Sequence, residues 1–103
     1  MLSVTGCGSE AASPEDLARQ LKCEGFTADP EEDFASAGGS CTLDGVWVAI
    51  YTFPDRSAQT QWIDAARSVG ATTLLVGSDF VVHSEHRPVL ETAAERLGGD
   101  LRD

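Results

Sequence analysis

The segment 46–53, which reads Val-Trp-Val-Ala-Ile-Tyr-Thr-Phe, is the feature of this chain that most constrains its fold. β-Branched and aromatic residues dominate it, and both alternating faces of the strand they would form are apolar. A strand of this kind belongs near the centre of a sheet and is covered, at least partly, on both sides. Asp44 and Gly45 precede it and carry the signal of a two-residue hairpin turn. We therefore expect a weak edge strand over about 36–43 to pair with it.

Three further segments have apolar residues at helical spacing. Each begins with a capping residue or with Pro at the first helical position, and each ends close to a glycine. In the second segment, Ala58, Trp62, Ala66 and Val69 form the apolar stripe. The expected helices span about 14–23, 56–69 and 88–97.

Two short apolar runs, 72–76 and 79–83, flank a Gly-Ser turn and are expected to form a second hairpin. The order helix, strand, strand, helix, strand, strand, helix favours the α+β class over a parallel sheet. We expect a two-layer sandwich, with a four-stranded antiparallel sheet and helices on one face. The single domain should span 14–99, after a flexible tether and before a polar tail at 100–103.

The charge balance excludes several classes of partner. The chain carries 17 acidic residues against 7 Lys and Arg, for a formal net charge of -10. Binding of nucleic acid or of anionic lipid by a basic face is therefore not expected. The acidic residues Asp29, Glu31, Glu32 and Asp33 form a run that lacks the ligand spacing of a calcium loop. They form either a solvated loop or a surface for a basic partner.

The three cysteines, Cys7, Cys23 and Cys41, form no Cys-x-x-Cys pair, so a zinc site is not expected. The residues 4–7, Val-Thr-Gly-Cys, resemble a bacterial lipobox, in which the cysteine carries a diacylglyceryl group. Only six residues precede Cys7. A signal peptide needs a basic and then an apolar region, which we expect upstream of Met1, so that 1–13 comprises a lipobox remnant and a flexible tether. The alternative is a flexible Gly- and Ser-rich tail with an incidental cysteine.

If Cys7 carries a lipid, Cys23 and Cys41 are left as a pair. In an oxidising compartment they would form a disulfide. The alternative is two reduced, buried thiols in a cytosolic protein.

These features together resemble the small secreted lipoproteins of actinobacteria. The resemblance rests on the lipobox-like Cys7, the polar segment after it, Cys23 and Cys41. It also rests on Gly-Ser-Asp-Phe-Val-Val at 77–82 and on Leu-Gly-Gly at 97–99. It implies an extracytoplasmic protein of uncharacterised function, anchored to the cell membrane through a lipid on Cys7, and it implies no catalytic residues. We expect no cofactor.

Aromatic residues on one face of the strand 46–53 are the first candidates for a binding site. Trp47, Tyr51 and Phe53 are separated by even numbers of positions and therefore share one face of the strand. They either pack in the core or, for Trp47 and Tyr51, form an exposed patch on an uncovered sheet face that would bind a partner.

His83 and His86 are the second candidates. In an extended chain these positions point to opposite faces, and a metal would need a further ligand such as Glu85. We expect two solvated histidines and no metal site.

The sequence therefore predicts a non-enzymatic, envelope-anchored domain that binds a protein or small ligand. One alternative is an exclusion or immunity lipoprotein that inhibits a phage or toxin component, since an acidic surface suits a basic target. Another is a small hydrolase-like enzyme using His83 or His86. The chain contains no Gly-x-Ser-x-Gly elbow and no phosphate-binding loop.

Overall fold

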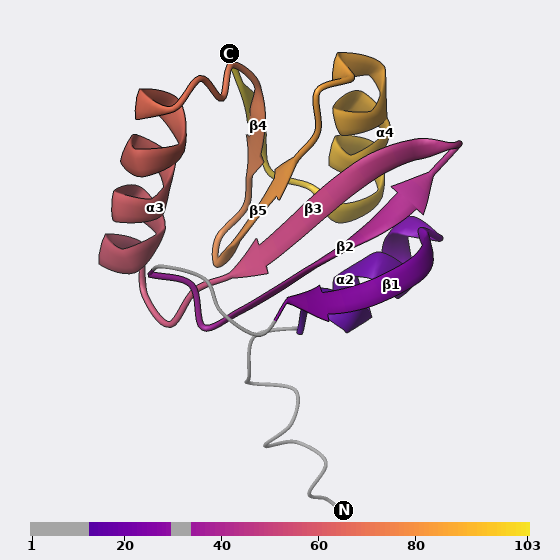
Figure 1. Ribbon diagram of the computed structural model, residues 1–103, viewed down its shortest axis with the longest axis horizontal. Coiled ribbons are helices and arrows are strands. Elements are labelled where there is room, and N and C mark those ends of the chain that lie inside the picture. The colour runs from indigo at the N-terminus through magenta and orange to yellow at the C-terminus, as the bar shows by residue number, and fades with distance from the viewer. Residues whose placement is uncertain (1–12, 30–33) are drawn as a thin grey trace, which may run out of the picture.

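The computed structural model describes residues 13–29 and 34–103. Three helices and six strands lie within these residues (Figure 1). The helices are α2 (Pro14–Leu21), α3 (Arg56–Ser68) and α4 (Arg87–Leu97). The strands are β1 (Glu24–Asp29), β2 (Ala37–Leu43), β3 (Val46–Thr52), β4 (Leu74–Val76), β5 (Phe80–His83) and β6 (Asp100–Arg102).

All six strands form one antiparallel sheet in the order β1-β2-β3-β5-β4-β6. Strand β3 lies inside the sheet, between β2 and β5, as its apolar sequence predicts. Asp44 and Gly45 form the turn between β2 and β3 with φ of 54° and 79°. Positive φ at both positions is what a type I′ hairpin turn requires. The predicted α+β class is confirmed.

The sheet has six strands, whereas the sequence predicts four. The two additional strands, β1 and β6, are the edges of the sheet and are largely polar. Strand β1 is mostly exposed, and its pairing with β2 shifts between Glu24 and Thr27. Gly25 lies at this irregularity with φ of 67°. Only Phe26 packs against the core, so β1 lacks the alternation of apolar residues by which strands are recognised.

The expected polar tail at 100–103 is also corrected, because it contains β6. Asp100 and Arg102 are exposed, whereas Leu101 lies opposite Leu75 of β4 and packs against the core. A strand of three residues with one apolar side chain carries no periodic signal.

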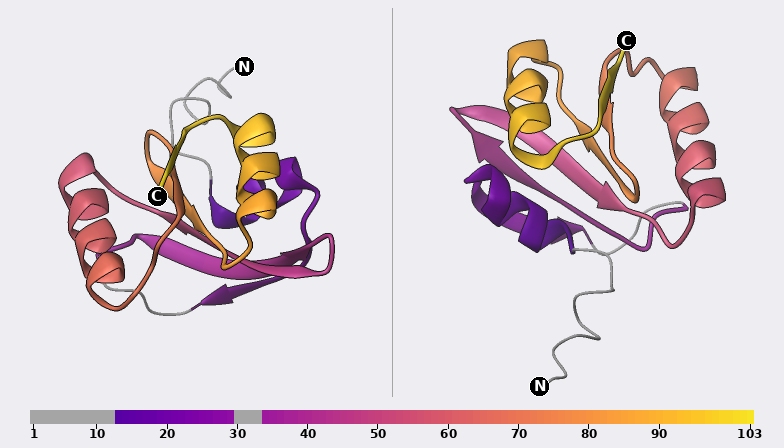
Figure 2. Two further views of the ribbon diagram at one scale, coloured as in Figure 1. Left: turned by 90° about the horizontal axis from the view of Figure 1, so that it is seen from above. Right: turned by 180° about the vertical axis from the view of Figure 1, so that it is seen from behind.

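Helices cover both faces of the sheet, so the expected arrangement of helices on one face is wrong. Helices α2 and α4 pack against the face that carries Val48 and Ile50 of β3. Helix α3 packs against the opposite face, where Tyr51 and Phe53 lie. Figures 1 and 2 show α3 on the other side of the molecule from α2 and α4. Successive residues of β3 point alternately into these two cores, which explains why the strand is apolar on both faces.

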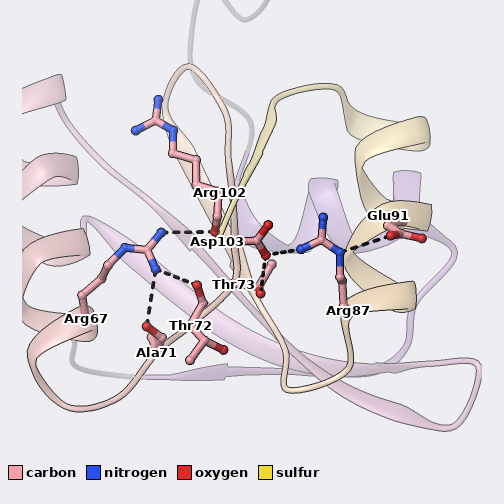
Figure 3. Close-up of polar contacts among 8 residues, drawn as sticks. All are labelled: Arg67, Ala71, Thr72, Thr73, Arg87, Glu91, Arg102 and Asp103. Atoms are coloured by element: carbon pink, nitrogen blue, oxygen red, sulfur yellow. Dashed lines mark hydrogen bonds and ion pairs between the residues drawn. The ribbon is translucent and has the colours of Figure 1, made fainter.

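The C-terminal end of α3 is fastened to the chain by the side chain of Arg67. Its Nη1 donates to the Thr72 carbonyl oxygen at 2.7 Å, and its Nη2 donates to the Arg102 carbonyl oxygen at 3.1 Å (Figure 3). Asp103 follows Arg102 in the chain. Its Oδ1 accepts from Thr73 Oγ1 at 2.9 Å and pairs with Arg87 of α4. These contacts link α3, β6 and α4.

A disulfide joins Cys23, just after α2, to Cys41 of β2, with the two Cα atoms 5.7 Å apart. Cys41 lies in the core, with 3% of its surface exposed. The bridge therefore attaches α2 and the start of edge strand β1 to the inner part of the sheet.

Replacing both bridging cysteines, Cys23→Ala with Cys41→Ala, should lower the free energy of unfolding by about 3 kcal/mol, the loop-closure entropy for a loop of this length. Urea unfolding of protein from an oxidising host measures the loss. Cys7→Ala is the matched control and should leave the urea midpoint unchanged, because Cys7 has no part in the bridge. Equal midpoints for all three proteins would contradict the prediction.

Candidate ligand groove beside helix α3

An open groove of about 680 Å³ lies between the C-terminal half of α3 and the sheet face that α3 covers. Aromatic side chains from three parts of the chain line it. They are Phe34, Trp47 and Tyr51 of β3, and Trp62 of α3. His83 and Glu85 also line the groove.

The sheet side of the groove follows from the pleat of β3. Trp47 and Tyr51 are four residues apart and therefore lie on the same face of the strand. Ala49 lies between them and is paired with His83 of β5. The Trp47 and His83 rings meet edge to face, with centroids 6.1 Å apart and planes at 87°.

The helix side of the groove follows from how α3 is anchored. Trp62 packs on Tyr51 with ring centroids 4.7 Å apart and on Phe53 at 6.0 Å. One turn earlier, Gln59 is buried and its Nε2 donates to the carbonyl oxygens of Gly77 and Phe80 at 2.9 and 3.0 Å. These contacts fix the first part of the helix.

Beyond Trp62, the helix presents small side chains to the groove. Ala65 and Ala66 line it, followed by Val69. An alanine side chain ends at Cβ, so this part of α3 leaves the aromatic rings of β3 accessible.

The exposed large hydrophobic side chains of the described residues gather at this groove. Within residues 13–29 and 34–103, three large hydrophobic residues are exposed: Phe34 at 45%, Trp47 at 53% and Val69 at 85%. All three line the groove. Scattered exposed hydrophobic residues are ordinary on protein surfaces, whereas a contiguous apolar patch marks an interaction site.

The groove has acidic character. Glu85 is the one charged side chain among its described lining residues. Burial lowers the pKa of His83 below its usual 6.5, and the charge of Glu85 only partly offsets this. His83 is therefore uncharged at neutral pH and adds no positive charge to the groove.

The predicted site residues have different outcomes. Trp47 is exposed, Tyr51 is half-buried against Trp62, and Phe53 is buried. The one aromatic strand face thus serves the core at one end and the groove at the other. Asp29 lies at the end of β1, opposite Gly38. Cys7, Glu31, Glu32 and Asp33 lie outside the described residues.

The two histidines lie in different surroundings. His83 lines the groove, whereas His86 is exposed at the N-terminus of α4. Between them, Ser84 is buried and its Oγ donates to the Trp47 carbonyl oxygen at 2.9 Å and accepts from the His86 amide at 3.2 Å. Ser84 therefore holds the start of β3 in place. Across the described part of the chain, no group of three or more His, Cys, Asp or Glu side chains could hold a metal ion.

Sequence reasoning missed three residues of the groove. Phe34, the first described residue after the acidic run, carried one available signal: it is a single aromatic residue in a polar segment. Val69 was expected on the apolar stripe of α3, but it follows the end of the helix and is exposed. Glu85 was considered only as a metal ligand.

The fold and the groove define a disulfide-bonded α+β domain with an aromatic surface groove. No protein-family model matches the sequence, and neither the curated proteins nor the solved structures searched contain a match. Among the residues that the structure describes, no helix has the length and apolar character needed to cross a membrane.

Trp47 and Trp62 should differ sharply in their contribution to stability. Trp62→Ala removes a buried ring that holds α3 on the sheet, and it should lower the free energy of unfolding by about 3 kcal/mol or more. Trp47→Ala removes an exposed ring and should cost less than about 1 kcal/mol. Urea unfolding of the two variants measures both values. Losses of equal size would show that Trp47 is also a core residue.

Proposed function

We propose that this chain is a non-enzymatic, envelope-anchored lipoprotein whose domain binds a protein or small ligand in the groove beside α3. The observation that carries the proposal is the convergence of Phe34, Trp47 and Val69, the exposed large hydrophobic side chains of the described residues, on this one groove. Covering them would remove apolar surface from water, which favours association.

The construction of the groove supports a role in binding. Its volume of about 680 Å³ lies within the range of ligand-binding sites, roughly 300–1,000 Å³. Its walls are anchored by Trp62 and Gln59, which hold α3 on the sheet, so little ordering is needed when a ligand binds. Tryptophan is also one of the residue types enriched at the energetic centre of protein interfaces.

The chemistry of the lining favours binding over catalysis. The hydroxyl of Ser84 is bonded to two backbone groups, and no bond from it to His83 is made. A serine nucleophile would need its hydroxyl directed at a base. We therefore assign no catalytic residues.

The location of the protein is proposed from the sequence around Cys7 and from the disulfide. The lipobox-like residues 4–7 and the similarity to small actinobacterial lipoproteins support a lipid on Cys7. The Cys23–Cys41 bridge is of the kind that persists in oxidising compartments. The lipobox-like sequence and the disulfide both support an extracytoplasmic location.

If Cys7 carries the anchor, protein expressed from its own gene, with the upstream sequence retained, should fractionate with membranes. Cys7→Ser should move it to the soluble fraction, because no thiol remains for acylation. Ser9→Ala is the control and should remain with the membranes. Wild-type protein in the soluble fraction would refute the anchor and leave the groove proposal standing.

The groove is tested by capture of partners from an envelope extract of the source organism on the immobilised full chain. Trp47→Ala should weaken the capture of a specific partner about tenfold or more, as expected for a tryptophan at the centre of an interface. Gln20→Ala, an exposed position on α2, is the control on the opposite side of the molecule and should bind as the wild type does. Capture that is insensitive to Trp47→Ala would refute the groove as the binding site.

A further inference from the structure

We infer that the occupant of the groove is a basic segment of a partner protein, with a Lys or Arg cation placed near Glu85 and against the Trp47 ring. The inference rests on the proposed function and specifies the chemistry of the ligand. It is carried by the distribution of charge around the groove and by the nature of its walls.

The groove excludes every positive charge that the protein has. All seven Lys and Arg residues lie in the described part of the chain, and none of them lines the groove. Arg19 pairs with acidic residues of its own helix, Arg87 with Glu91 and Asp103, and Arg67 binds backbone carbonyls. Among the described lining residues, the one charged side chain is Glu85, and burial lowers the pKa of His83, which favours its neutral form. A cationic group entering the groove therefore meets attraction and no opposing charge.

The walls suit a long basic side chain in particular. An ammonium or guanidinium group is attracted to the face of an aromatic ring within about 6 Å, and tryptophan is the strongest such partner. More than half of Trp47 is exposed and available for this contact. Lys and Arg bury their methylene groups on apolar surface while their charge stays hydrated, and Phe34 and Val69 provide such surface.

The charge of the whole chain distinguishes among possible occupants. A second copy would bring another formal charge of -10, and an anionic membrane surface would likewise be repelled. A basic protein segment would be attracted before contact, which speeds association. The groove is also open to solvent along its rim, with Phe34, Trp47 and Val69 each about half exposed or more. A partner protein can cover such a rim, whereas a small cation would leave most of it in water.

The tryptophans make the inference measurable. The sequence contains two tryptophans, Trp47 and Trp62, and both line the groove. Their fluorescence and their indole N–H signals in NMR spectra therefore report directly on its occupancy. The probes are a short peptide of alternating arginine and glycine, and the same peptide with each arginine replaced by citrulline, which keeps the shape and removes the charge.

The arginine peptide should bind saturably and shift the indole signal of Trp47, and the citrulline peptide should bind at least about threefold more weakly. Glu85→Gln should weaken binding of the arginine peptide about two- to fivefold, the size of a cationic contact at a partly exposed site. Glu95→Gln makes the same charge change at an exposed position on α4 and should leave the affinity unchanged.

The other outcomes separate this inference from the proposed function. Equal binding of the two peptides, or equal effects of Glu85→Gln and Glu95→Gln, would overturn the cationic ligand, and so would a failure of the arginine peptide to bind. If Trp47→Ala still abolished capture of the envelope partner in those cases, the groove would remain the binding site for an uncharged ligand. If Trp47→Ala also left the capture of the envelope partner unchanged, both the cationic ligand and the groove as binding site would be overturned.

Discussion

Strand β3 is apolar on both faces and buried at its centre, and this constraint determines where the helices pack. Val48 and Ile50 need cover on one face, and Tyr51 and Phe53 need it on the other. Helices α2 and α4 supply the first, and α3 supplies the second through Trp62, with Ile63 and alanine side chains packed beside it. Because the side chains of Ala65 and Ala66 end at Cβ, the C-terminal half of α3 covers only part of its face. The uncovered part, at Trp47, forms the sheet wall of the groove.

Much of the architecture follows from local sequence signals that act over a few residues. Ser13 caps α2 through a bond from the Asp16 amide to its Oγ, and Asp55 caps α3 in the same way. The Asp44-Gly45 turn pairs β2 with β3. These features were predictable, because a cap or a turn depends on the chemistry of neighbouring residues. The α+β class follows from their order along the chain.

What could not be predicted depends on contacts between distant residues. The edge strands β1 and β6 are held by pairing with β2 and β4, not by their own apolar patterns. The side of the sheet on which α3 packs depends on the contacts of Trp62 with Tyr51 and Phe53. The spacing of apolar residues along one helix does not predict those contacts. The groove was missed in part for the same reason. Trp47 was recognised as a candidate, but Phe34, Val69 and Glu85 join it only through the fold.

The acidic composition and the exposed groove are physically connected. An exposed set of aromatic and aliphatic side chains promotes self-association, because two copies can bury their apolar surfaces together. A formal charge of -10 on each copy opposes such contact at low salt. The same charge attracts a basic segment. Such a segment can cover the apolar surface of the groove without the repulsion that a second copy meets. In the proposed function, charge at long range selects which partners reach the groove, and the aromatic lining provides the short-range contact.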